Sequence, residues 1–269
     1  MLGDNGDVLL TGFVGARTVL GSAVERILTT DEEEATGGAD LVEGNAGSDI
    51  IIGGVNNTGG FNGDGIDYLY GDARNPVSNL DGNDIILGDN GLLDYGVTGD
   101  LNDLDLIETT ARSAGGVVLG GVDHIFGNAG ADTAFGEEGN DIILGGVNGG
   151  VNGSVDVLSG STGEDVILGD NGLIHFYYDW AADNSIDDYA TEDYADNDGD
   201  PSTIDLVRSF HDGLGGIDIV SGQQASDLLL GGEAGDFMYG DDATASSGVA
   251  DLGDVMLGDN GDIFLDGVL

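Results

Sequence analysis

The sequence contains no cysteine and no lysine, and it has only five arginines, three histidines and two prolines. Without cysteine the fold has no disulfide support, and soft transition metals find few ligands. No apolar run approaches the length of a membrane-spanning helix. Because 52 acidic residues face the five arginines, the formal net charge is -47. This charge disfavours nucleic acid and anionic membrane surfaces as partners, and we expect no membrane insertion.

The remaining composition is rich in glycine, acid and apolar residues. Hydrophobic residues make up 40% of the chain, which argues against plain disorder. A chain this acidic should nonetheless fold poorly by itself, because compaction concentrates the charge repulsion. Bound cations would relieve that repulsion. We therefore expect folding to be coupled to cation binding.

A nine-residue pattern is written twice between Gly127 and Leu144, as GNAGADTAF and GEEGNDIIL. Each copy has a glycine-rich turn, an aspartate at the sixth position and then an apolar triplet. Glycines at the first and fourth positions are expected to take positive φ and to turn the chain tightly. Thirteen such units occur, and in four of them the fourth glycine is replaced, by Ser154, Ala225, Ala234 and Leu252. We expect these four turns to hold a metal less well.

The apolar triplet of each unit predicts a short strand. Side chains alternate along a strand, so the middle residue faces opposite to its two neighbours. In all thirteen units this middle residue is apolar, which predicts that these residues line a core: Val42, Ile51, Leu69, Ile86, Ile125, Ala134, Ile143, Leu158, Ile167, Val220, Leu229, Met238 and Met256.

The sixth-position aspartates form an equally regular column. Stacked at the roughly 4.8 Å spacing of neighbouring strands, these like charges would repel strongly unless a hard cation lay between them. Calcium fits, because it takes six to eight oxygen ligands and accepts backbone carbonyls beside carboxylates. The predicted metal ligands are Asp40, Asp49, Asp67, Asp84, Asp123, Asp132, Asp141, Asp156, Asp165, Asp218, Asp227, Asp236 and Asp254.

The units GNAGADTAF, GEEGNDIIL, GSTGEDVIL and GNAGSDIII resemble the nonapeptide of the RTX calcium-binding parallel β-roll family. The resemblance implies an all-β fold, a parallel β-roll or β-solenoid of calcium-binding nonapeptide turns. It also implies that each sixth-position aspartate and the turn carbonyls of adjacent rungs share a Ca²⁺ ion, so that several ions bind per chain. A secreted protein at an extracellular or cell-surface location is expected.

A longer period lies over the nonapeptides. The string LGDNG begins at Leu2, Leu87, Leu168 and Leu257, so a single continuous solenoid over 1–269 divides into super-repeats 2–86, 87–167 and 168–256 and a partial fourth, 257–269. In each of the three complete super-repeats, an apolar stretch after GDNG leads out to a polar insert and another leads back. This pattern predicts three β-hairpin flap insertions. The outgoing and returning stretches are Val8 to Leu10 with Arg26 to Thr30, Leu92 to Tyr95 with Leu104 to Thr110, and Leu173 to Tyr178 with Ile204 to Phe210.

The GDNG turns depart from the nonapeptide pattern. Their aspartates, Asp4, Asp89, Asp170 and Asp259, stand second in the turn, and the sixth position is apolar. Either these residues supply the carboxylate from a different place, or the turns are metal-free and mark the exit point of a flap. We include the four among the predicted metal ligands, because a free carboxylate beside a column of others is hard to tolerate.

The outward positions of the strands are also apolar, with Tyr68, Tyr70, Phe237 and Tyr239 among them. A strand that is apolar on both sides is usually covered on both sides. The flaps, a second roll or another protein could provide the cover. We expect the flaps to cover one face and the other face to be an association surface. With two strands per turn, and with the GDNG strands counted, the solenoid should have eight or nine turns.

No pattern of catalytic residues is present. His124, His175 and His211 lie in no recognisable catalytic context, and the acidic pairs are interpreted as metal ligands, so we expect no enzyme. The segments GDNGDVLLTG and GDNGDIFLDG show that both ends share one phase of the repeat. Two explanations compete, a window of a longer repeat array or a protomer that stacks end to end.

The sequence therefore predicts a calcium-binding structural repeat module of an extracellular or cell-surface protein, such as an adhesin, a surface-layer protein or a filament-forming component. Calcium would fold and stiffen the module, and copies would associate end to end or side by side. The alternative is a calcium-dependent ligand-binding module that recognises a glycan, ice or a partner protein through one exposed face.

Overall fold

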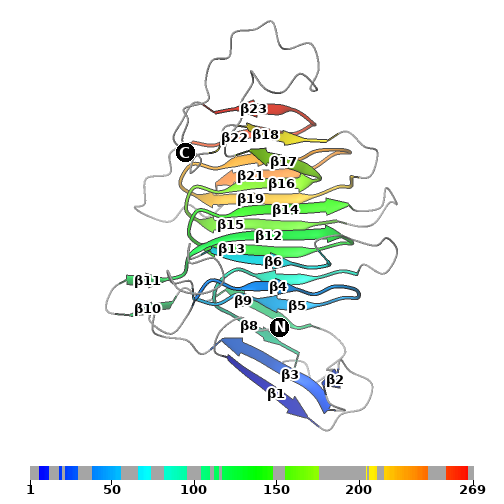
Figure 1. The fold of residues 1–269 in the computed structure, drawn as a ribbon, viewed down its shortest axis with the longest axis vertical. Helices are drawn as coiled ribbons and strands as arrows, with labels where there is room; N and C mark the ends of the chain where they lie inside the picture. The colour runs from blue at the N-terminus through cyan, green and yellow to red at the C-terminus, as the bar shows by residue number, and fades with distance from the viewer. Residues whose placement is uncertain are drawn as a thin grey trace, which may run out of the picture.

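The computed structural model of the chain describes residues 6–11, 18–19, 22–29, 38–55, 66–73, 82–95, 104–109, 112–114, 117–147, 155–175, 204, 206–210, 215–241 and 253–265. These residues form twenty-three β-strands, stacked along the long axis of the molecule (Figure 1). The part of the chain that the structure describes contains no helix long and apolar enough to cross a membrane.

Two parallel sheets form the body of the molecule. In spatial order, the seven-stranded sheet consists of β22 (Val255–Leu257), β20 (Leu228–Leu230), β16 (Val166–Asp170), β14 (Ile142–Val147), β12 (Val122–Ala129), β6 (Ile66–Tyr70) and β4 (Leu41–Glu43). The six-stranded sheet consists of β21 (Phe237–Asp241), β19 (Ile219–Gln224), β15 (Val157–Thr162), β13 (Thr133–Glu138), β7 (Ile85–Leu87) and β5 (Ile50–Ile52).

The chain visits the two parallel sheets in strict alternation. Following the sequence from β4 to β22, every nonapeptide strand lies in the opposite sheet from the one before it. Two strands therefore make one turn, as expected for a β-roll. The number of turns predicted from the sequence was wrong: thirteen strands give between six and seven turns, because the strands after GDNG do not join the parallel sheets.

The core between the two sheets consists of the middle residues of the triplets. In both parallel sheets these side chains are in register from strand to strand, as with Ile125 opposite Ile143 in β12 and β14. The buried cluster contains ten of the thirteen predicted core residues, and Val42 and Met238 pack against it. Met256 is the exception, since it lies on the edge strand β22 and is 49% exposed.

Antiparallel sheets lie near each end of the roll (Figure 1). The first has the order β1 (Gly6–Thr11), β3 (Ser22–Thr29), β8 (Gly91–Asp94) and β9 (Leu106–Thr109), and β2 (Thr18–Val19) pairs with β3. The second has the order β17 (Gly172–His175), β18 (Leu206–Ser209) and β23 (Asp262–Phe264). A separate pair joins β10 (Arg112–Ala114) and β11 (Val117–Leu119).

The outgoing and returning stretches pair with each other in these sheets. β1 pairs with β3, β8 with β9 and β17 with β18, all antiparallel. Most of the connecting inserts, 12–17, 96–103 and 176–203 among them, fall outside the described residues, so the predicted flaps as whole insertions stay a prediction.

The first antiparallel sheet covers part of the six-stranded parallel sheet. Ile27 of β3 and Leu93 of β8 are buried together with Ile52 of β5 and Leu87 of β7. Phe135 of β13 packs against the same cluster. Apolar residues on the outer side of these strands are thus buried, although they do not face the core of the roll.

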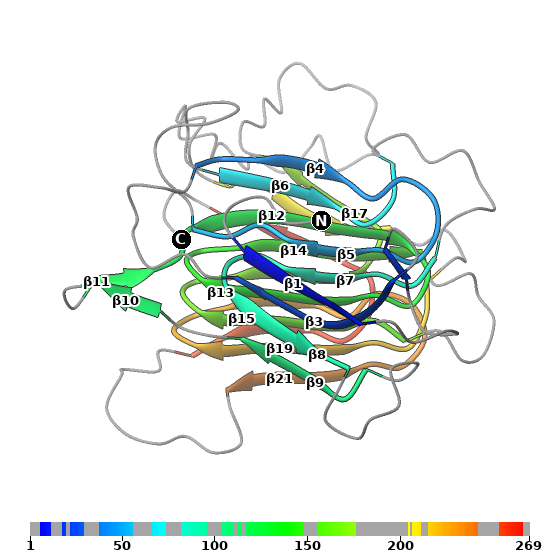
Figure 2. The same ribbon diagram turned by 90° about the horizontal axis from the view of Figure 1, so that it is seen from below.

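The second antiparallel sheet covers part of the opposite, seven-stranded sheet. Val207 of β18 is buried with Leu168 of β16 and Leu230 of β20, and Ile174 and Ile263 pack against this cluster. The expectation that the flap strands cover one face of the roll was therefore wrong. They cover one face near one end and the other face near the other end, as the view along the roll also shows for β1, β3, β8 and β9 (Figure 2).

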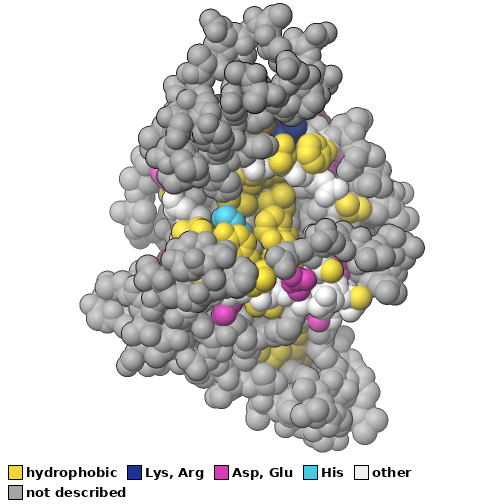
Figure 3. Space-filling model, viewed as in Figure 1, with side chains coloured by type: hydrophobic (Ala, Val, Ile, Leu, Met, Phe, Trp, Pro, Cys, Tyr) yellow, Lys and Arg dark blue, Asp and Glu magenta, His cyan; other side chains and the backbone are white. Residues whose placement is uncertain are grey.

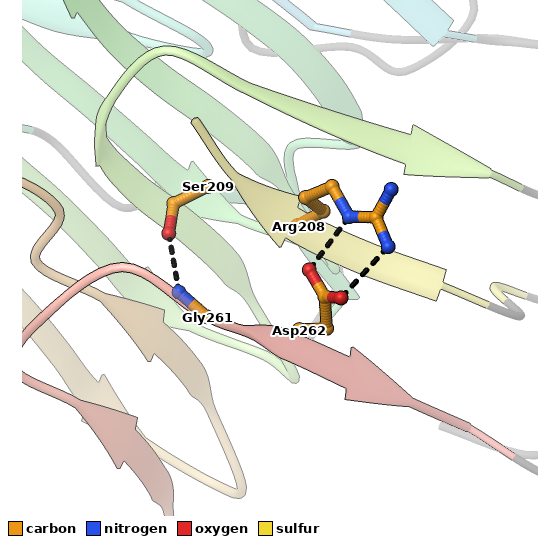
Figure 4. A network of polar contacts seen from close by, with 4 residues as sticks. All are labelled: Arg208, Ser209, Gly261 and Asp262. Atoms are coloured by element: carbon orange, nitrogen blue, oxygen red, sulfur yellow. Dashed lines mark hydrogen bonds and ion pairs between the residues drawn. The ribbon is translucent and has the colours of Figure 1, made fainter. Parts of the chain in front are cut away.

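The packing of the second antiparallel sheet is completed by polar contacts (Figure 4). Arg208 donates from Nε to Asp262 Oδ1 at 2.6 Å and from a terminal nitrogen to Asp262 Oδ2 at 2.7 Å. The backbone N–H of Gly261 donates to the Ser209 hydroxyl at 2.9 Å. These contacts tie β18 to the GDNG turn before β23.

Some outer positions stay uncovered. Phe237 and Tyr239 of β21 are 57% and 50% exposed on the six-stranded sheet. On the other sheet, aromatic rings stack from strand to strand, with centroids 4.7 Å apart between Tyr70 of β6 and Phe126 of β12. Figure 3 shows hydrophobic side chains, with a histidine among them, over the middle of the face seen there.

Candidate calcium-binding ladder

The thirteen sixth-position aspartates, called the ladder aspartates below, occupy equivalent places in the coils. In most of them the Oδ1 oxygen accepts the backbone N–H of the ladder aspartate in the neighbouring coil. Asp132 donates to Asp156 Oδ1 at 2.8 Å, and Asp141 donates to Asp165 Oδ1 at 2.8 Å. Ten such bonds, of 2.6 to 3.1 Å, run along the two columns. One oxygen of each of these carboxylates is thus fixed by the backbone.

The second carboxylate oxygen, Oδ2, is different. It is buried and accepts no hydrogen bond in seven ladder aspartates: Asp40, Asp84, Asp132, Asp141, Asp156, Asp165 and Asp236. A buried charged oxygen without a partner costs several kcal/mol of effective desolvation energy, by an order-of-magnitude estimate. A regular column of such oxygens indicates a ligand that the protein's own donors do not replace.

A glycine at each corner of the roll shows where these oxygens converge. At Gly127, an added Cβ would lie 2.5 Å from Asp132 Oδ2 and 2.6 Å from the carbonyl oxygen of Gly145 in the neighbouring coil. At Gly53, it would collide with Asp67 Oδ2 and with the carbonyl oxygen of Gly88. Only glycine leaves room for an aspartate oxygen and a carbonyl oxygen of the next coil to approach the same place.

The spacing from each ladder aspartate to the glycine that follows it predicts these corners better than the start of the nonapeptide does. A glycine stands four residues after every ladder aspartate, in all thirteen cases, even where an insert follows. At twelve of these glycines a Cβ would approach the Oδ2 atom of the next ladder aspartate along the chain. The conserved spacing within this chain therefore reflects a close approach at the corner.

The expectation of positive φ at the first and fourth turn positions was half wrong. Positive φ occurs at the second and fourth positions, as in Asn128 (76°) and Gly130 (138°) of one turn. The first glycine serves close approach instead. Ala225 and Ala234, which replace fourth-position glycines, adopt φ of 86° and 73°. These two turns thus keep the left-handed conformation in spite of the substitution, at a cost that glycine avoids.

Burial dominates the electrostatics of the ladder. Desolvation raises the pKa of Asp84 to about 8, of Asp132 to about 7 and of Asp156 to about 8, although backbone N–H donors lower it in each case. Burial also raises the pKa of Asp141 and of Asp165, and neighbouring acids add to the effect. The ladder therefore favours either a proton or a cation on these oxygens.

The donor set fits a hard divalent cation. Each corner combines a carboxylate oxygen with backbone carbonyl oxygens. Among the described residues, no three His, Cys, Asp or Glu side chains lie close enough to bind a metal ion by side chains alone. Mixed carboxylate and carbonyl donors are typical of calcium sites. The ladder aspartates and the corner glycine carbonyls would hold the ion. When bound, Ca²⁺ supplies positive charge that offsets the carboxylates of successive coils.

The GDNG aspartates that the structure describes, Asp89, Asp170 and Asp259, do not lie in the ladder. Asp4 falls outside the described residues, and Asp259 is exposed. Asp170 is buried and accepts two backbone N–H groups, from Gly216 at 2.9 Å and from Glu233 at 2.5 Å. Asp89 is buried and accepts the N–H of Glu138 at 3.0 Å and also that of Gly121. Asp89 and Asp170 thus tie the point where the chain leaves the roll to a turn of the next coil, and their role as metal ligands stays a prediction.

Asp72 lies at an equivalent exit from the roll, and the sequence analysis did not identify it. It follows the corner glycine Gly71, as Asp89 follows Gly88, and its Oδ2 accepts the N–H of Ala129 at 3.2 Å. In Asp72, Asp89 and Asp170 alike, the donor is the third residue of the turn in the next coil. The signal was a Gly-Asp pair directly after a nonapeptide strand and before an insert. We call these three the exit aspartates.

Four segments of the chain, 34–57, 119–148, 152–172 and 212–243, match the family model of the RTX calcium-binding nonapeptide repeat. Asp67, Asp84 and Asp254 lie outside the matched segments, although the structure places them in the same two columns as the others. Neither the curated proteins nor the solved structures contain a match to this chain.

Proposed function

Because this chain carries RTX calcium-binding nonapeptide repeats, which bind Ca²⁺ in several copies, we propose that it is a structural module of an extracellular or cell-surface protein, folded and stiffened by calcium. Such a module would serve in an adhesin, a surface layer or a filament. We further propose that it catalyses no reaction, since its buried acidic groups form repeating columns with backbone partners.

The observation that supports this function is the ladder of Oδ2 oxygens. Each is buried at a corner where two coils meet, so that a cation there joins successive coils. A calcium-rich environment outside the cell would favour the bound and folded state. Inside a cell, where free calcium is scarce, the same chain would remain unfolded.

Removing calcium tests the proposal. In calcium-free buffer at pH 7.5 the circular dichroism signal of the strands should be lost, and adding back Ca²⁺ should restore it. Adding Mg²⁺ at the same concentration should restore less, because Mg²⁺ demands regular octahedral geometry and gives up its water reluctantly. A strand signal that is unchanged by calcium removal would overturn the proposal.

End-to-end association is supported by the exposed edge of the roll. β22 is the edge strand of the seven-stranded sheet, and its residues Val255 and Met256 are 51% and 49% exposed. We propose that a strand of a second copy adds to this edge. Sedimentation velocity in calcium should then show assemblies that grow with concentration and that Met256→Asp reduces. A monomer at every concentration would contradict this.

The alternative function, ligand binding through one face, is supported by the uncovered part of the six-stranded sheet. Ile219, Phe237 and Tyr239 are 37%, 57% and 50% exposed there, side by side on two paired strands. A glycan-binding face would use such rings for stacking. Binding to an immobilised glycan panel should be lost in Tyr239→Ser while the calcium-dependent fold is kept. Equal binding of the two proteins would exclude this face.

A further inference from the structure

The exit towards β8 contains a group of buried oxygens that neither the ladder nor the nonapeptide pattern includes. Asp89, Asn90 and Glu137 are 1%, 0% and 4% exposed. Asp89 Oδ1, Glu137 Oε1 and both polar atoms of the Asn90 amide are buried and have no hydrogen-bond partner. Two buried carboxylates and an amide oxygen are thus left unsatisfied within one short region.

Backbone contacts bring the two carboxylates together. The N–H of Asn90, in the peptide that follows Asp89, donates to the carboxylate of Glu137. The N–H of Glu138, in the peptide that follows Glu137, donates back to Asp89 Oδ2 at 3.0 Å. Each carboxylate is therefore held against the backbone beside the other, and the negative charges of Asp89, Glu137 and the ladder residue Asp141 act on one another. In the described part of the chain, the arginine ion pairs join Arg26 to Asp94 and Arg208 to Asp262, and neither involves this group.

The other exit aspartates provide internal controls. The second position of the facing turn is Glu137 opposite Asp89, but it is Gly232 opposite Asp170 and Asn128 opposite Asp72. Asp89 and Asp170 each accept a backbone N–H from the glycine two positions before a ladder aspartate, Gly121 or Gly216, and another from the third residue of the facing turn, so these contacts do not distinguish the two. A Cβ on Gly232 would also collide with Asp170. Only at Asp89 does a second acid face the exit aspartate, and only there do both acids keep an unsatisfied oxygen.

We propose that Asp89 Oδ1, Glu137 Oε1 and the Asn90 amide oxygen form an additional binding site for a divalent, oxygen-preferring cation, beside the ladder corner of Asp141. Two carboxylates and one amide are the hard oxygen ligands that Ca²⁺ takes in proteins. One divalent ion would balance the two negative charges. The ion would fasten the chain's exit from the roll to the turn of the next coil, between β13 and β14.

The experiment is a crystal structure of the calcium-loaded protein with anomalous diffraction recorded at a long wavelength, where calcium scatters anomalously. A peak is expected between Asp89 and Glu137, in addition to peaks at the ladder corners. At Asp170, which faces Gly232 in place of a second acid, this inference expects no peak, in contrast to the prediction made from the GDNG string. The peak should disappear in Glu137→Gly, a variant that places at this turn the residue found at Gly232 and that suits its φ of 84°.

Metal content measured by mass spectrometry at fixed free Ca²⁺ gives a second readout. Glu137→Gly and Glu137→Gln should each bind one Ca²⁺ ion fewer per chain than the unchanged protein. Glu164→Gln, an equal change of charge on a neighbouring turn, should leave the number unchanged. An equal number in all four proteins, or two carboxylates that contact each other with no anomalous peak, would overturn the inference. Failure of the proposed function looks different, because the ladder peaks would then be missing in every protein.

Discussion

The two antiparallel sheets are built from the same kind of strands, yet they lie on opposite faces of the roll. The first packs on the six-stranded sheet and the second on the seven-stranded sheet. Five nonapeptide strands, β12 to β16, separate the exit before β8 from the exit before β17. Because consecutive nonapeptides alternate between sheets, an odd number moves the second exit to the other face.

Even numbers have the opposite effect. Four nonapeptide strands, β4 to β7, separate β3 from β8, and four, β19 to β22, separate β18 from β23. In both cases the two GDNG-associated strands lie in the same antiparallel sheet and pair directly. The number of short repeats between two GDNG strings thus decides which face is covered, and the composition of the flap strands does not.

The largest effect should come from acting on the roll that both antiparallel sheets share. Burial raises the pKa of Asp84, Asp132 and Asp156 from the ordinary 3.8 to about 8, 7 and 8, so the calcium-free fold binds more protons than the unfolded chain. Its stability is therefore greatest below about pH 4 and is lost as pH rises towards 8. Urea unfolding of the calcium-free protein should show a midpoint that falls as pH rises from 4.5, until no folded protein is left to unfold at pH 7.5.

Calcium should reverse this dependence. Protons compete with the cation for the same oxygens, so in saturating Ca²⁺ the urea midpoint should rise over the same pH range. The two antiparallel sheets should lose hydrogen-exchange protection together with the roll. A calcium-free midpoint that rises with pH would contradict the burial of uncompensated carboxylates.

A change in the number of nonapeptides between the two exits should change which face of the roll the second antiparallel sheet covers. Deleting Gly127 to Phe135, one nonapeptide, should bring both antiparallel sheets to the same face, whereas deleting Gly127 to Leu144, two nonapeptides, should keep them on opposite faces. The chain has no cysteine, so Glu108→Cys and Phe210→Cys allow specific spin labels on the two sheets. The distance between labels should change more for the smaller deletion. Opposite faces in both variants would disprove the parity rule.

Truncating one apolar residue in each antiparallel sheet should separate their contributions. Leu93 of the first antiparallel sheet is fully buried against the roll, whereas Ile263 of the second is only partly buried against it. Leu93→Ala should cost about 2–5 kcal/mol of unfolding free energy and Ile263→Ala less. Urea unfolding in saturating Ca²⁺ measures both, with the exposed Leu106→Ala as the control. A larger loss for Ile263 would reverse the assignment of burial.

The smallest effect should come from the arginine ion pairs of the described residues. Arg208 bonds to both oxygens of Asp262 and is 15% exposed, while Arg26 contacts one oxygen of Asp94 and is 47% exposed. Arg208→Ala should therefore cost more than Arg26→Ala, and each should cost about 1 kcal/mol or less. The difference should shrink in 1 M salt. Equal losses that do not respond to salt would indicate packing in place of charge.

The repeating parts of the fold could be predicted from the sequence because a single pattern is read thirteen times. The core column, from Ile51 to Leu229, and the ladder column both follow from the alternation of side chains along each triplet. The prediction that Met256 is buried was wrong because the period of the sequence does not indicate which strand lies at the edge of a sheet. The turn count failed because the GDNG strands look like further coils, although their aspartate stands too early to reach the ladder.

The candidate site could be predicted only as far as it is periodic. The exit aspartates and Glu137 depend on which coil lies next to which, and Asp89 and Glu138 are 49 residues apart in the chain. The position of positive φ was also hidden, because glycine serves two purposes in the turn. Gly127 is needed for close approach and Gly130 for its φ of 138°, and the letters alone do not distinguish them.

The corner glycines determine how such a chain can grow. Gly136 lies against an aspartate five positions later, whereas Gly169 lies against Asp218, forty-nine positions later, and both corners have the same construction. Connections of very different length can therefore leave a corner without a change in the register of the roll, since only the glycine and the following aspartate must meet again. Domains inserted by design at successive corners along one edge would therefore be spaced at regular intervals along the roll.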